Sequence, residues 1–576
     1  APIMPLPEGG RSRLFQVDGT PLVGRAAERQ EIIARMEEAL AGRGGIVLLE
    51  GEPGAGKTRL LTECAEDANW RGLSVLWGGT SPAGATKPFE GLQRALGDGL
   101  TELRVHQLAE RMDRVWLQAL APLLPALGRW APELEEEVAL RGGTETRDRV
   151  REAFHRTFVA LAQLTPTMLV LDDLHRIDED TLWALDALAA DLAGTPLLIC
   201  VAYRRLELEA QPEQWQTVRS LDRSGRQSRI VLDPLSPSEA GELVRRVWPE
   251  GTTGTLVGRL HAATGGNPLF LLETLRAVHE RQVTEALKPP TGVPAIDVPD
   301  LPVSGTVYEM IRGRLDALPG EPLQAARALA ASGSSMDIDG MAEVCGLPRP
   351  QVLDAVDYLI QAGMISTSTG KYRLSHDQLG QVAYDSMAPD DRPELHRRLA
   401  WLLEGDRTFD PGALGHHFRL GAVPAEAARY LEQAGTEARR LSAFATARDR
   451  LSEALSEAGK VPWPEADLAR LRLAQEEVLE VLADRDGQHR LLDELDAAAQ
   501  HDPVLAAQVL SRRAWLLGST ARFEEATALA AQALDVHTRL GDTAGRAGDL
   551  QTLGTIAFWG SRNLEAIEWL SEALEL

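Results

Sequence analysis

The sequence predicts a chain of several domains: an α/β domain with a parallel sheet, then a helical domain, a winged helix and a series of helical repeats. Three observations lead to this order. A length of 576 residues exceeds what one hydrophobic core serves, so we expect about three or four domains. An apolar run followed by a glycine-rich turn lies near the start of the chain. Alanine pairs recur at fixed spacing in a helical pattern from about residue 413 onward.

The composition is acidic, with 60 Lys plus Arg against 85 Asp plus Glu and a formal net charge of −25. This charge disfavours long-range attraction to nucleic acid or to an anionic membrane. Any contact with DNA would therefore need a basic module that this sequence does not contain. The most apolar stretch, residues 116–130, is broken by Pro122, Pro125 and Arg129, so we expect no membrane span.

The cysteines indicate a reducing compartment. Three are present, far apart and without metal-ligand spacing, which predicts neither a disulfide framework nor a zinc site: Cys64, Cys200 and Cys345. No charged, apolar and small-residue segment typical of a secretion signal opens the sequence. We therefore expect a cytoplasmic protein.

Residues 1–20 are rich in Pro, Gly and Arg and lack periodicity, so we interpret them as a flexible tail. The first domain is expected over residues 21–235. Its opening segment, Val23-Gly24-Arg25, places a flexible turn and a cation before a helix expected over residues 26–40. On its own this segment is a weak signal of function.

A phosphate-binding loop is predicted directly after the apolar strand at residues 46–49. The pattern G-x-x-x-x-G-K-[ST] is matched by Gly51-Glu52-Pro53-Gly54-Ala55-Gly56-Lys57-Thr58. Gly54 and Gly56 let backbone N–H groups surround phosphate oxygens, Lys57 bridges the outer phosphates, and Thr58 offers a hydroxyl to Mg²⁺. The helix that follows points its positive end at the same anion. The loop therefore predicts nucleotide binding.

Two acidic residues end a later strand of the same sheet. Residues 73–77 are predicted to form the second strand, and residues 167–171 form an apolar strand that leads into Asp172 and Asp173. Ligands bind at the carboxyl ends of strands in such sheets. One acid can hold Mg²⁺ and the other can polarise an attacking water.

A further buried strand at residues 196–201 is followed by Arg204 and Arg205. Arg204 is a candidate sensor of the terminal phosphate, although a surface arginine at a strand exit explains it as well. The last strand is expected at residues 229–232, and a helical domain over residues 236–287 follows. There Pro268 either packs against the adenine ring or simply starts a helix.

Residues 288–302 are rich in proline and predict a linker before a winged helix over residues 303–400. Its helices are expected at residues 307–318, 323–331, 338–345 and 351–362, followed by a hairpin through Thr369-Gly370. The candidate recognition helix carries Asp354 and Asp357 and no Lys or Arg, so we expect a regulatory lid and not a DNA reader. His376 ends the wing, where a histidine is more often structural than a ligand.

The remaining residues, 401–576, are predicted to form helical hairpins of somewhat long period that resemble tetratricopeptide repeats. The pattern rests on alanines seven apart that let paired helices pack closely: Ala447 and Ala454, Ala526 and Ala533, Ala566 and Ala573. Such arrays present a concave binding surface. The last residues stop within a repeat, so we expect the natural chain to continue.

These motifs together resemble the signal-transduction ATPases with numerous domains (STAND). The residues that carry the resemblance are Leu22-Val23-Gly24-Arg25, the phosphate loop, Leu169-Val170-Leu171-Asp172-Asp173-Leu174-His175, Gly265-Gly266-Asn267-Pro268 and Ser375-His376-Asp377. Within that class the chain is most similar to the large ATP-binding regulators of the LuxR family, relatives of the maltose regulator MalT. The resemblance is strong over about residues 20–400 and is one of architecture only over the repeats.

The resemblance implies a slow Mg²⁺-dependent ATPase that serves as a switch. It implies a resting ADP-bound monomer, converted by ATP and an inducer at the repeats into an assembly that activates transcription. Asp173, Lys57 and Arg204 would be catalytic, and Thr58 and Asp172 would bind Mg²⁺. The nucleotide would be held by Val23, Gly24, Arg25, Gly51, Gly54, Ala55, Gly56, Lys57, Thr58, Arg59, Pro268 and His376. Gly24, Arg25 and Pro268 would surround the base and ribose, and His376 would contact the ADP diphosphate.

The family's C-terminal DNA-binding domain is not in this sequence, so the same module would also suit a regulator of a kinase, a cyclase or another protein partner. A DNA-processing motor or transporter ATPase fits poorly, because the charge is acidic and no transporter signature is found. A scaffold with a dead nucleotide site is disfavoured because Lys57, Asp172 and Asp173 are all present.

Overall fold

The computed structural model describes residues 21–79, 87–131, 144–190, 192–221, 227–249, 254–286, 307–368, 370–405 and 410–576. The tail expected at residues 1–20, the linker expected at residues 288–302 and Thr369 of the expected hairpin lie outside this range. The chain divides into two compact units. The first contains residues 1–140 and 148–422, and the second contains residues 141–147 and 423–576.

The first unit is built on a five-stranded parallel sheet with the strand order β2-β3-β4-β1-β5. The strands are β1 (Gly45–Gly51), β2 (Ser74–Gly78), β3 (Thr167–Leu171), β4 (Leu197–Tyr203) and β5 (Gln227–Leu232). Strands covered on both faces of a parallel sheet are nearly continuous apolar runs, as β1, β3 and β4 are, whereas in the edge strand β5 buried residues alternate with more exposed ones. The predicted parallel α/β fold is confirmed.

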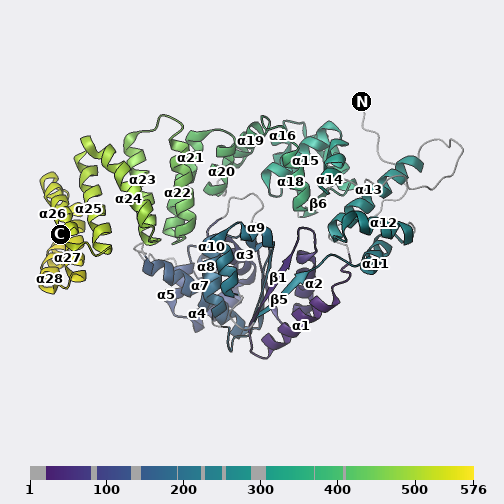
Figure 1. The fold of residues 1–576 in the computed structure, drawn as a ribbon, viewed down its shortest axis with the longest axis horizontal. Coiled ribbons are helices and arrows are strands. Elements are labelled where there is room, and N and C mark those ends of the chain that lie inside the picture. The colour runs from purple at the N-terminus through teal and green to yellow at the C-terminus, as the bar shows by residue number, and fades with distance from the viewer. Residues whose placement is uncertain are drawn as a thin grey trace. The chain divides into compact units, whose positions relative to one another are not determined.

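Helices cover both faces of the sheet (Figure 1). On one face, side chains such as Val47, Leu49 and Val170 pack with α1 (Ala26–Leu40) and α2 (Lys57–Trp70). The other helices of this domain are α3 (Glu90–Gly99), α4 (Glu102–Arg111), α5 (Arg114–Leu120), α6 (Pro125–Trp130), α7 (Thr144–Leu164), η4 (Leu174–Arg176), α8 (Glu179–Ala190), α9 (Arg205–Glu209) and α10 (Pro212–Leu221). Since all strands are parallel, the residues that follow β1, β3 and β4 meet at one edge of the sheet.

Three further helices form a small apolar core of their own: α11 (Pro237–Val247), α12 (Gly254–Thr264) and α13 (Pro268–Ala286). Val23 and Leu235 also belong to this core. Helix α11 starts at a capping box in which Ser236 and Glu239 satisfy each other's backbone groups, which defines where the helix begins. The segment before α1 is thereby packed against the helical domain.

The next elements have the order of a winged helix: α14 (Val307–Asp316), α15 (Gly320–Ser332), α16 (Ile338–Cys345), α17 (Arg349–Gln361), β6 (Ile365–Ser368), β7 (Lys371–Leu374), α18 (Asp377–Asp385) and α19 (Arg392–Glu404). Strands β6 and β7 pair antiparallel, and Met336 forms an isolated antiparallel bridge to Tyr372 of β7. Helix α17 begins two residues earlier than the helix predicted at 351–362. The candidate recognition helix therefore does contain an arginine, Arg349, and this arginine pairs with Asp339.

The boundary expected at residue 401 falls inside α19. Helix α20 (Pro411–Leu420) packs on α19 within the first unit, because two buried histidines join them. His396 Nδ1 and His417 Nδ1 lie 3.0 Å apart, and Tyr384 Oη lies 2.8 Å from His396 Nε2. Burial lowers the pKa of His396 to about 4 and that of His417 to about 3, so both rings are neutral.

The second unit consists of helices that pack in antiparallel pairs: α21 (Pro424–Arg440), α22 (Phe444–Ala458), α23 (Glu465–Val481), α24 (Arg485–Ala498), η6 (Ala499–His501), α25 (Pro503–Ser519), α26 (Phe523–Leu540), α27 (Thr543–Trp559) and α28 (Asn563–Glu575). Ala447, Ala454, Ala526 and Ala533 are fully buried, as close helix packing requires. Turn residues with positive φ recur at intervals of about 40 residues, at Ser442, Ala483, Ala521 and Ser561. Over the described residues, every helix is too short or too polar to cross a membrane.

Candidate phosphate-binding site

The loop between β1 and α2 has the backbone geometry of an anion cradle. Gly54 and Gly56 have φ angles of 79° and 94°, in the left-handed region that glycine adopts readily. Helix α2 begins at Lys57, and the first N–H groups of a helix have no acceptor within it. A Cβ added at Gly56 would meet no heavy atom within 4 Å, so the cradle is open on that side. The loop thus fits a phosphate group.

Lys57 lies within this cradle and is only 6% exposed. Its Nζ donates to the carbonyl oxygens of Gly51 at 2.8 Å and Glu52 at 3.2 Å. Burial and the nearby charge of Arg204 lower the pKa of Lys57, although Asp173 and Asp172 act in the opposite direction. A buried ammonium group held by carbonyl oxygens alone is suited to an anionic partner.

Thr58 and the two acids after β3 meet at the next position along the sheet edge. Thr58 Oγ1 donates to Asp172 Oδ2 at 2.6 Å, and the Asp173 N–H donates to Asp172 Oδ1 at 2.9 Å. Burial, followed by the charge of Asp173, raises the pKa of Asp172. The structure therefore brings together Thr58 and Asp172, the pair expected to bind Mg²⁺.

Asp173 and Arg204 share a small charged cluster at the ends of β3 and β4. Asp173 has a φ of 53°, a left-handed conformation that Asp and Asn tolerate better than most residues. Its Oδ1 lies 3.8 Å from His175 Nε2, and that nitrogen is 3.0 Å from Glu207 Oε2. Arg204 Nη1 donates to Glu207 Oε1 at 2.8 Å. Burial lowers the pKa of His175 to about 4, so the ring is neutral between these charges.

Val23, Gly24 and Arg25 lie on the other side of the loop. Arg25 is 6% exposed, and its Nη2 donates to the carbonyl oxygens of Ala55 at 3.3 Å and Asp233 at 2.6 Å. Gly24 lies so close to Glu239 that an added Cβ would come within 2.7 Å of its side chain. The segment thus ties the phosphate loop to β5 and the helical domain, and its expected role at the base and ribose stays a prediction.

Pro268 is the first residue of α13, and the residue before it joins this helix to the phosphate loop. Asn267 Nδ2 donates to the Pro53 carbonyl at 2.9 Å, while Asn267 Oδ1 accepts from the N–H of Leu269 at 3.1 Å. The Leu269 N–H also lies 3.3 Å from the Gly54 carbonyl oxygen. Pro268 is thereby placed beside the loop, and both readings of it, at the base or as a helix start, remain open.

His376 caps α18 and faces the helical domain. Its Nδ1 accepts from the Leu379 N–H at 3.1 Å, and its Nε2 lies 3.5 Å from Glu273 Oε1. The adjacent Asp377 pairs with Arg176 of η4 at 2.8 Å. The winged helix therefore contacts the first domain just after the acidic pair, while the predicted contact of His376 with a diphosphate stays a prediction.

Two candidate residues of the loop point elsewhere. The side chain of Ala55 is buried in the core on the α2 face of the sheet. Arg59 pairs with Glu63 one turn further along α2. For Ala55 only the backbone is thus suited to a role at a phosphate, and Arg59 has an ion-pair partner on its own helix.

Several residues of the site were not identified from the sequence. Asn267 and Asp377 were quoted only as parts of motifs, and Glu207 and Glu273 were not singled out at all. Glu273 lies on α13 and is 3% exposed. A signal was present, since Glu273 stands four residues after Leu269 and so shares its face of the helix. A charge on a face that is otherwise packed requires a partner.

The residues present fit a nucleotide with Mg²⁺. The open N–H cradle and the buried Lys57 would hold phosphates, and Thr58 Oγ1 with Asp172 would hold the cation through oxygen ligands, which Mg²⁺ prefers. Burial, together with the charge of Asp173, raises the pKa of Asp172, so its negative charge is unfavourable in the chain alone. A divalent cation would supply the missing positive charge.

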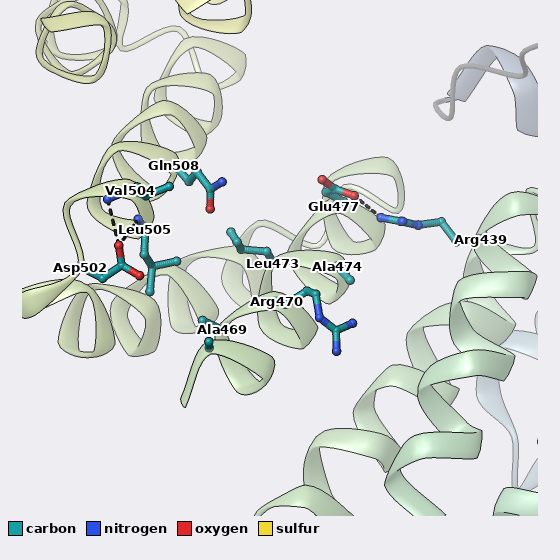
Figure 2. Close-up of a pocket in the computed structure, with 11 residues that line it drawn as sticks. Arg439, Ala469, Arg470, Leu473, Ala474, Glu477, Asp502, Val504, Leu505 and Gln508 are labelled. Carbon is teal, nitrogen blue, oxygen red and sulfur yellow. Dashed lines mark hydrogen bonds and ion pairs between the residues drawn. The ribbon is translucent and has the colours of Figure 1, made fainter. Parts of the chain in front are cut away.

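The second unit contains a groove of about 410 Å³ between α21, α23 and α25. Part of its lining is apolar, formed by residues such as Leu473 and Leu505. Figure 2 shows the ion pair of Arg439 with Glu477 on one side, and on the other Asp502, which accepts from the N–H groups of Val504 and Leu505 at 2.9 and 3.1 Å. The groove thus combines apolar surface with charged groups at its rim.

Comparison with known proteins agrees with this geometry. Residues 21–200 match the model of the AAA ATPase domain family. An uncharacterized protein of Rhizobium meliloti (strain 1021) is 25% identical over 468 residues, which are 77% of this chain and 43% of that protein. The chain therefore spans less than half the length of that curated relative.

Two solved structures resemble the chain at low identity. One is a STAND protein with a tetratricopeptide repeat sensor from Pyrococcus horikoshii, with 14% identity, a TM-score of 0.45, and coverage of 97% of this chain and 78% of that chain. The other is a Walker-type ATPase of Pyrococcus abyssi, with 15% identity, a TM-score of 0.34, and coverage of 64% and 99%. Both TM-scores are below 0.5, so neither establishes a fold shared along the whole chain. The similarity that counts is local: residues 21–200 are similar to AAA ATPase domains and carry the loop geometry that such a domain needs to bind nucleotide.

Proposed function

We propose that this chain is a signal-transduction ATPase of the STAND type, in which binding and slow hydrolysis of ATP switch the arrangement of the domains. The observation that carries the proposal is that two other domains contact the ATPase domain, one at the phosphate loop and the other just after the acidic pair. Asn267 joins α13 to the loop, and Asp377 joins the winged helix to η4. A change at the loop can therefore bias the position of both domains.

Each residue of the site has a role in this proposal. ATP and Mg²⁺, when bound, supply the phosphoryl group and the charge that stabilises its transfer. Lys57 and the N–H groups of the cradle bind the phosphates, and Thr58 and Asp172 hold the cation. Asp173 orients a water molecule and accepts its proton at a carboxylate oxygen, and Arg204 senses the terminal phosphate.

Within this class we favour a transcription activator of the LuxR family, held as an ADP-bound monomer in the cytoplasm. An inducer, either a small molecule or a protein, would bind the helical repeats, where the groove between α21 and α25 provides apolar surface. With ATP the chain would self-assemble. DNA would be bound only through a C-terminal domain outside this sequence.

The alternative output is a kinase, a cyclase or another protein partner. In either case the winged helix acts as a lid, since α17 exposes Asp354 and Asp357 and its Arg349 is paired with Asp339. Fluorescence anisotropy with mixed-sequence duplex DNA tests this reading. Tight, salt-dependent binding of DNA by this chain would contradict it.

The variant Lys57→Ala tests the proposal as a whole. Loss of a hydrogen bond to a charged group costs about 1.5–3 kcal/mol, so ADP and ATP should bind at least about tenfold more weakly. Isothermal titration calorimetry of the purified chain measures both affinities. The control is Lys371→Ala, which removes an exposed lysine of β7 and should leave both affinities unchanged. Affinities of Lys57→Ala within about threefold of the parent would refute the assignment of the loop.

A further inference from the structure

Glu273 of α13 lies at the centre of a buried group of charges between the helical domain and the winged helix. Its Oε1 is 3.3 Å from Arg276 Nη1, and its Oε2 pairs with Arg314 of α14. Burial by itself raises the pKa of Glu273, but the hydrogen bond from His376 and the charges of Arg314 and Arg276 outweigh it and hold this pKa at about 2. The carboxylate is therefore ionised throughout the physiological pH range.

The two arginines also anchor the winged helix. Arg276 Nη1 donates to the Gly363 carbonyl at 3.0 Å, and Arg314 Nη2 donates to the Ala362 carbonyl at 2.9 Å. Both carbonyls belong to the turn between α17 and β6. Glu273 thus holds the arginines that fix this turn, and it does so through one carboxylate.

The third partner of Glu273 is His376, whose Nδ1 is engaged by the cap of α18. Because Nδ1 accepts the Leu379 N–H at 3.1 Å, that nitrogen carries no hydrogen. A neutral ring then has its single N–H on Nε2, which lies 3.5 Å from Glu273 Oε1. As long as it caps α18, His376 can donate to one acceptor at a time.

The phosphate loop is close to this contact. Helix α13 touches Gly54 through the Leu269 N–H, and Glu273 stands one helical turn further on the same face. The four-residue step from Leu269 to Glu273 corresponds to about 6 Å along the helix axis. A phosphate in the loop would lie near the start of α13, and the Glu273 carboxylate lies about one turn further along the same helix. Both groups are anionic acceptors of hydrogen bonds.

We propose that Glu273 is a positioning residue of the nucleotide site. Its carboxylate accepts the single ring N–H of His376 in the nucleotide-free chain, and His376 donates this N–H to a phosphate when a nucleotide binds. This inference rests on the proposed function. His376 leaves Glu273 when it contacts a nucleoside diphosphate, and the two arginines keep Glu273 compensated after it has left. The winged helix is thereby released from one contact and gains another, so binding of ADP rearranges this interface without unpairing a buried charge.

A double-mutant cycle tests the inference with ADP affinity as its readout. Glu273→Gln keeps the shape of the side chain and removes the charge that competes for the His376 N–H. We expect ADP to bind about threefold to tenfold more tightly to this variant in calorimetry. In the His376→Ala background the same substitution should change the affinity by less than about twofold, because the competition no longer exists.

A matched control separates the effect of Glu273 on His376 from its effect on the arginines that anchor the winged helix. Arg314→Met removes an arginine partner of Glu273 and leaves the contact with His376 in place. Its effect on ADP affinity should be the same with and without His376. Equal effects of Glu273→Gln in both backgrounds, or weaker ADP binding by Glu273→Gln, would overturn the inference. Thermal melting of each variant establishes that it is folded.

A second readout uses nuclear magnetic resonance of the chain labelled with ¹⁵N-histidine, with the His376→Ala spectrum as the assignment. The His376 signals should show an unprotonated Nδ1, and the Nε2 signal should shift on addition of ADP. An unchanged Nε2 signal in protein that binds ADP would also overturn the inference. If Lys57→Ala retains ADP, the proposed function itself fails. If Lys57→Ala loses ADP and the cycle shows no coupling, only the role of Glu273 fails.

Discussion

Asp172 and Glu273 are both buried carboxylates, and their surroundings act on them in opposite directions. Asp172, 9% exposed, accepts from a hydroxyl and a backbone N–H and has Asp173 as its neighbour, so its pKa is raised by burial and by that charge. Glu273, 3% exposed, faces two guanidinium groups and an imidazole N–H, which hold its pKa at about 2.

This difference in compensation separates an acid that can bind a cation from an acid that holds two domains together. A buried carboxylate without full compensation costs free energy in the folded chain, and a cation from solution can remove that cost. A carboxylate with two arginines has no such need, and its removal would instead take a shared partner away from both arginines. The two buried acids thus differ in what compensates them: a cation from solution can compensate Asp172, and the chain's own arginines compensate Glu273.

The largest expected effect concerns the acidic pair. Asp173→Asn removes the proton acceptor, and Asn tolerates the left-handed φ of 53° at this position. ATP hydrolysis should therefore fall by about a hundredfold or more, while Mg-ATP still binds. Phosphate release and calorimetry measure the two quantities. Equal hydrolysis by parent and variant would remove Asp173 from the mechanism.

Truncation of the compensated acid should act on stability. Glu273→Ala leaves Arg276 and Arg314 without their shared carboxylate, and breaking a buried pair costs about 3–5 kcal/mol. Chemical unfolding of the nucleotide-free chain measures the loss. The control is Glu394→Ala, since Glu394 is half exposed and pairs with Arg397 and Arg398 at the surface, where the loss should be below about 1 kcal/mol. Equal losses of stability in Glu273→Ala and Glu394→Ala would mean that Glu273 does not hold the two domains together.

Neutralisation of Asp172 should raise the stability of the chain, whereas truncation of Glu273 should lower it. Asp172→Asn removes a charge that burial and Asp173 disfavour, while the amide oxygen can still accept from the Asp173 N–H and the NH2 group can donate to Thr58 Oγ1. The nucleotide-free chain should gain about 1 kcal/mol of stability, and the dependence of ATP binding on Mg²⁺ should be lost. Thermal melting with and without Mg²⁺ checks both. Lower stability of the variant would show that the chain itself compensates Asp172.

The smallest expected effect concerns His396 and His417, which are buried but neutral and therefore avoid the free-energy cost of a buried charge. Their pKa values of about 4 and 3 lie below the unfolded value near 6.5, so the unfolded chain takes up protons first as the pH falls. The stability contributed by the neutral rings is present above about pH 6.5 and is lost as the pH falls towards 4 and 3.

The neighbours of the pair are Arg392 and His416, whose charges disfavour protonation further. His417→Leu should make the dependence of the unfolding free energy on pH shallower by about one proton between pH 6.5 and 4. Urea unfolding across this range measures the slope. An unchanged slope would mean that His417 does not titrate on unfolding.

The parts of the molecule that were predictable depend on local pattern. The central strands β1, β3 and β4 were recognisable because each is a continuous buried run, and the loop because its glycines, Lys57 and Thr58 are close in sequence. The alanine spacing indicated the close packing of the repeats in the same way. Periodicity and motif suffice where one segment contains the whole signal.

The parts that were missed depend on contacts between distant segments. Glu273 meets Arg314 and His376, which come from other helices of the chain, and nothing near Glu273 distinguishes it from a surface glutamate except the face it occupies. The role of Arg25 at the base and ribose stays a prediction, but the hydrogen bonds of its side chain to the Ala55 and Asp233 carbonyls were not foreseen. Hydrogen-bond partners of this kind are determined by tertiary packing, which a single sequence does not display.

The attachment of α13 to the phosphate loop has a consequence for how this chain can evolve. Asn267 fixes the start of the helix at the loop, and Glu273 meets the winged helix further along it. One inserted or deleted residue between them would turn Glu273 by about 100° around the helix axis and away from His376. Substitutions in this segment can be tolerated during evolution, but its length should be constant, and insertions or deletions should be absent from it.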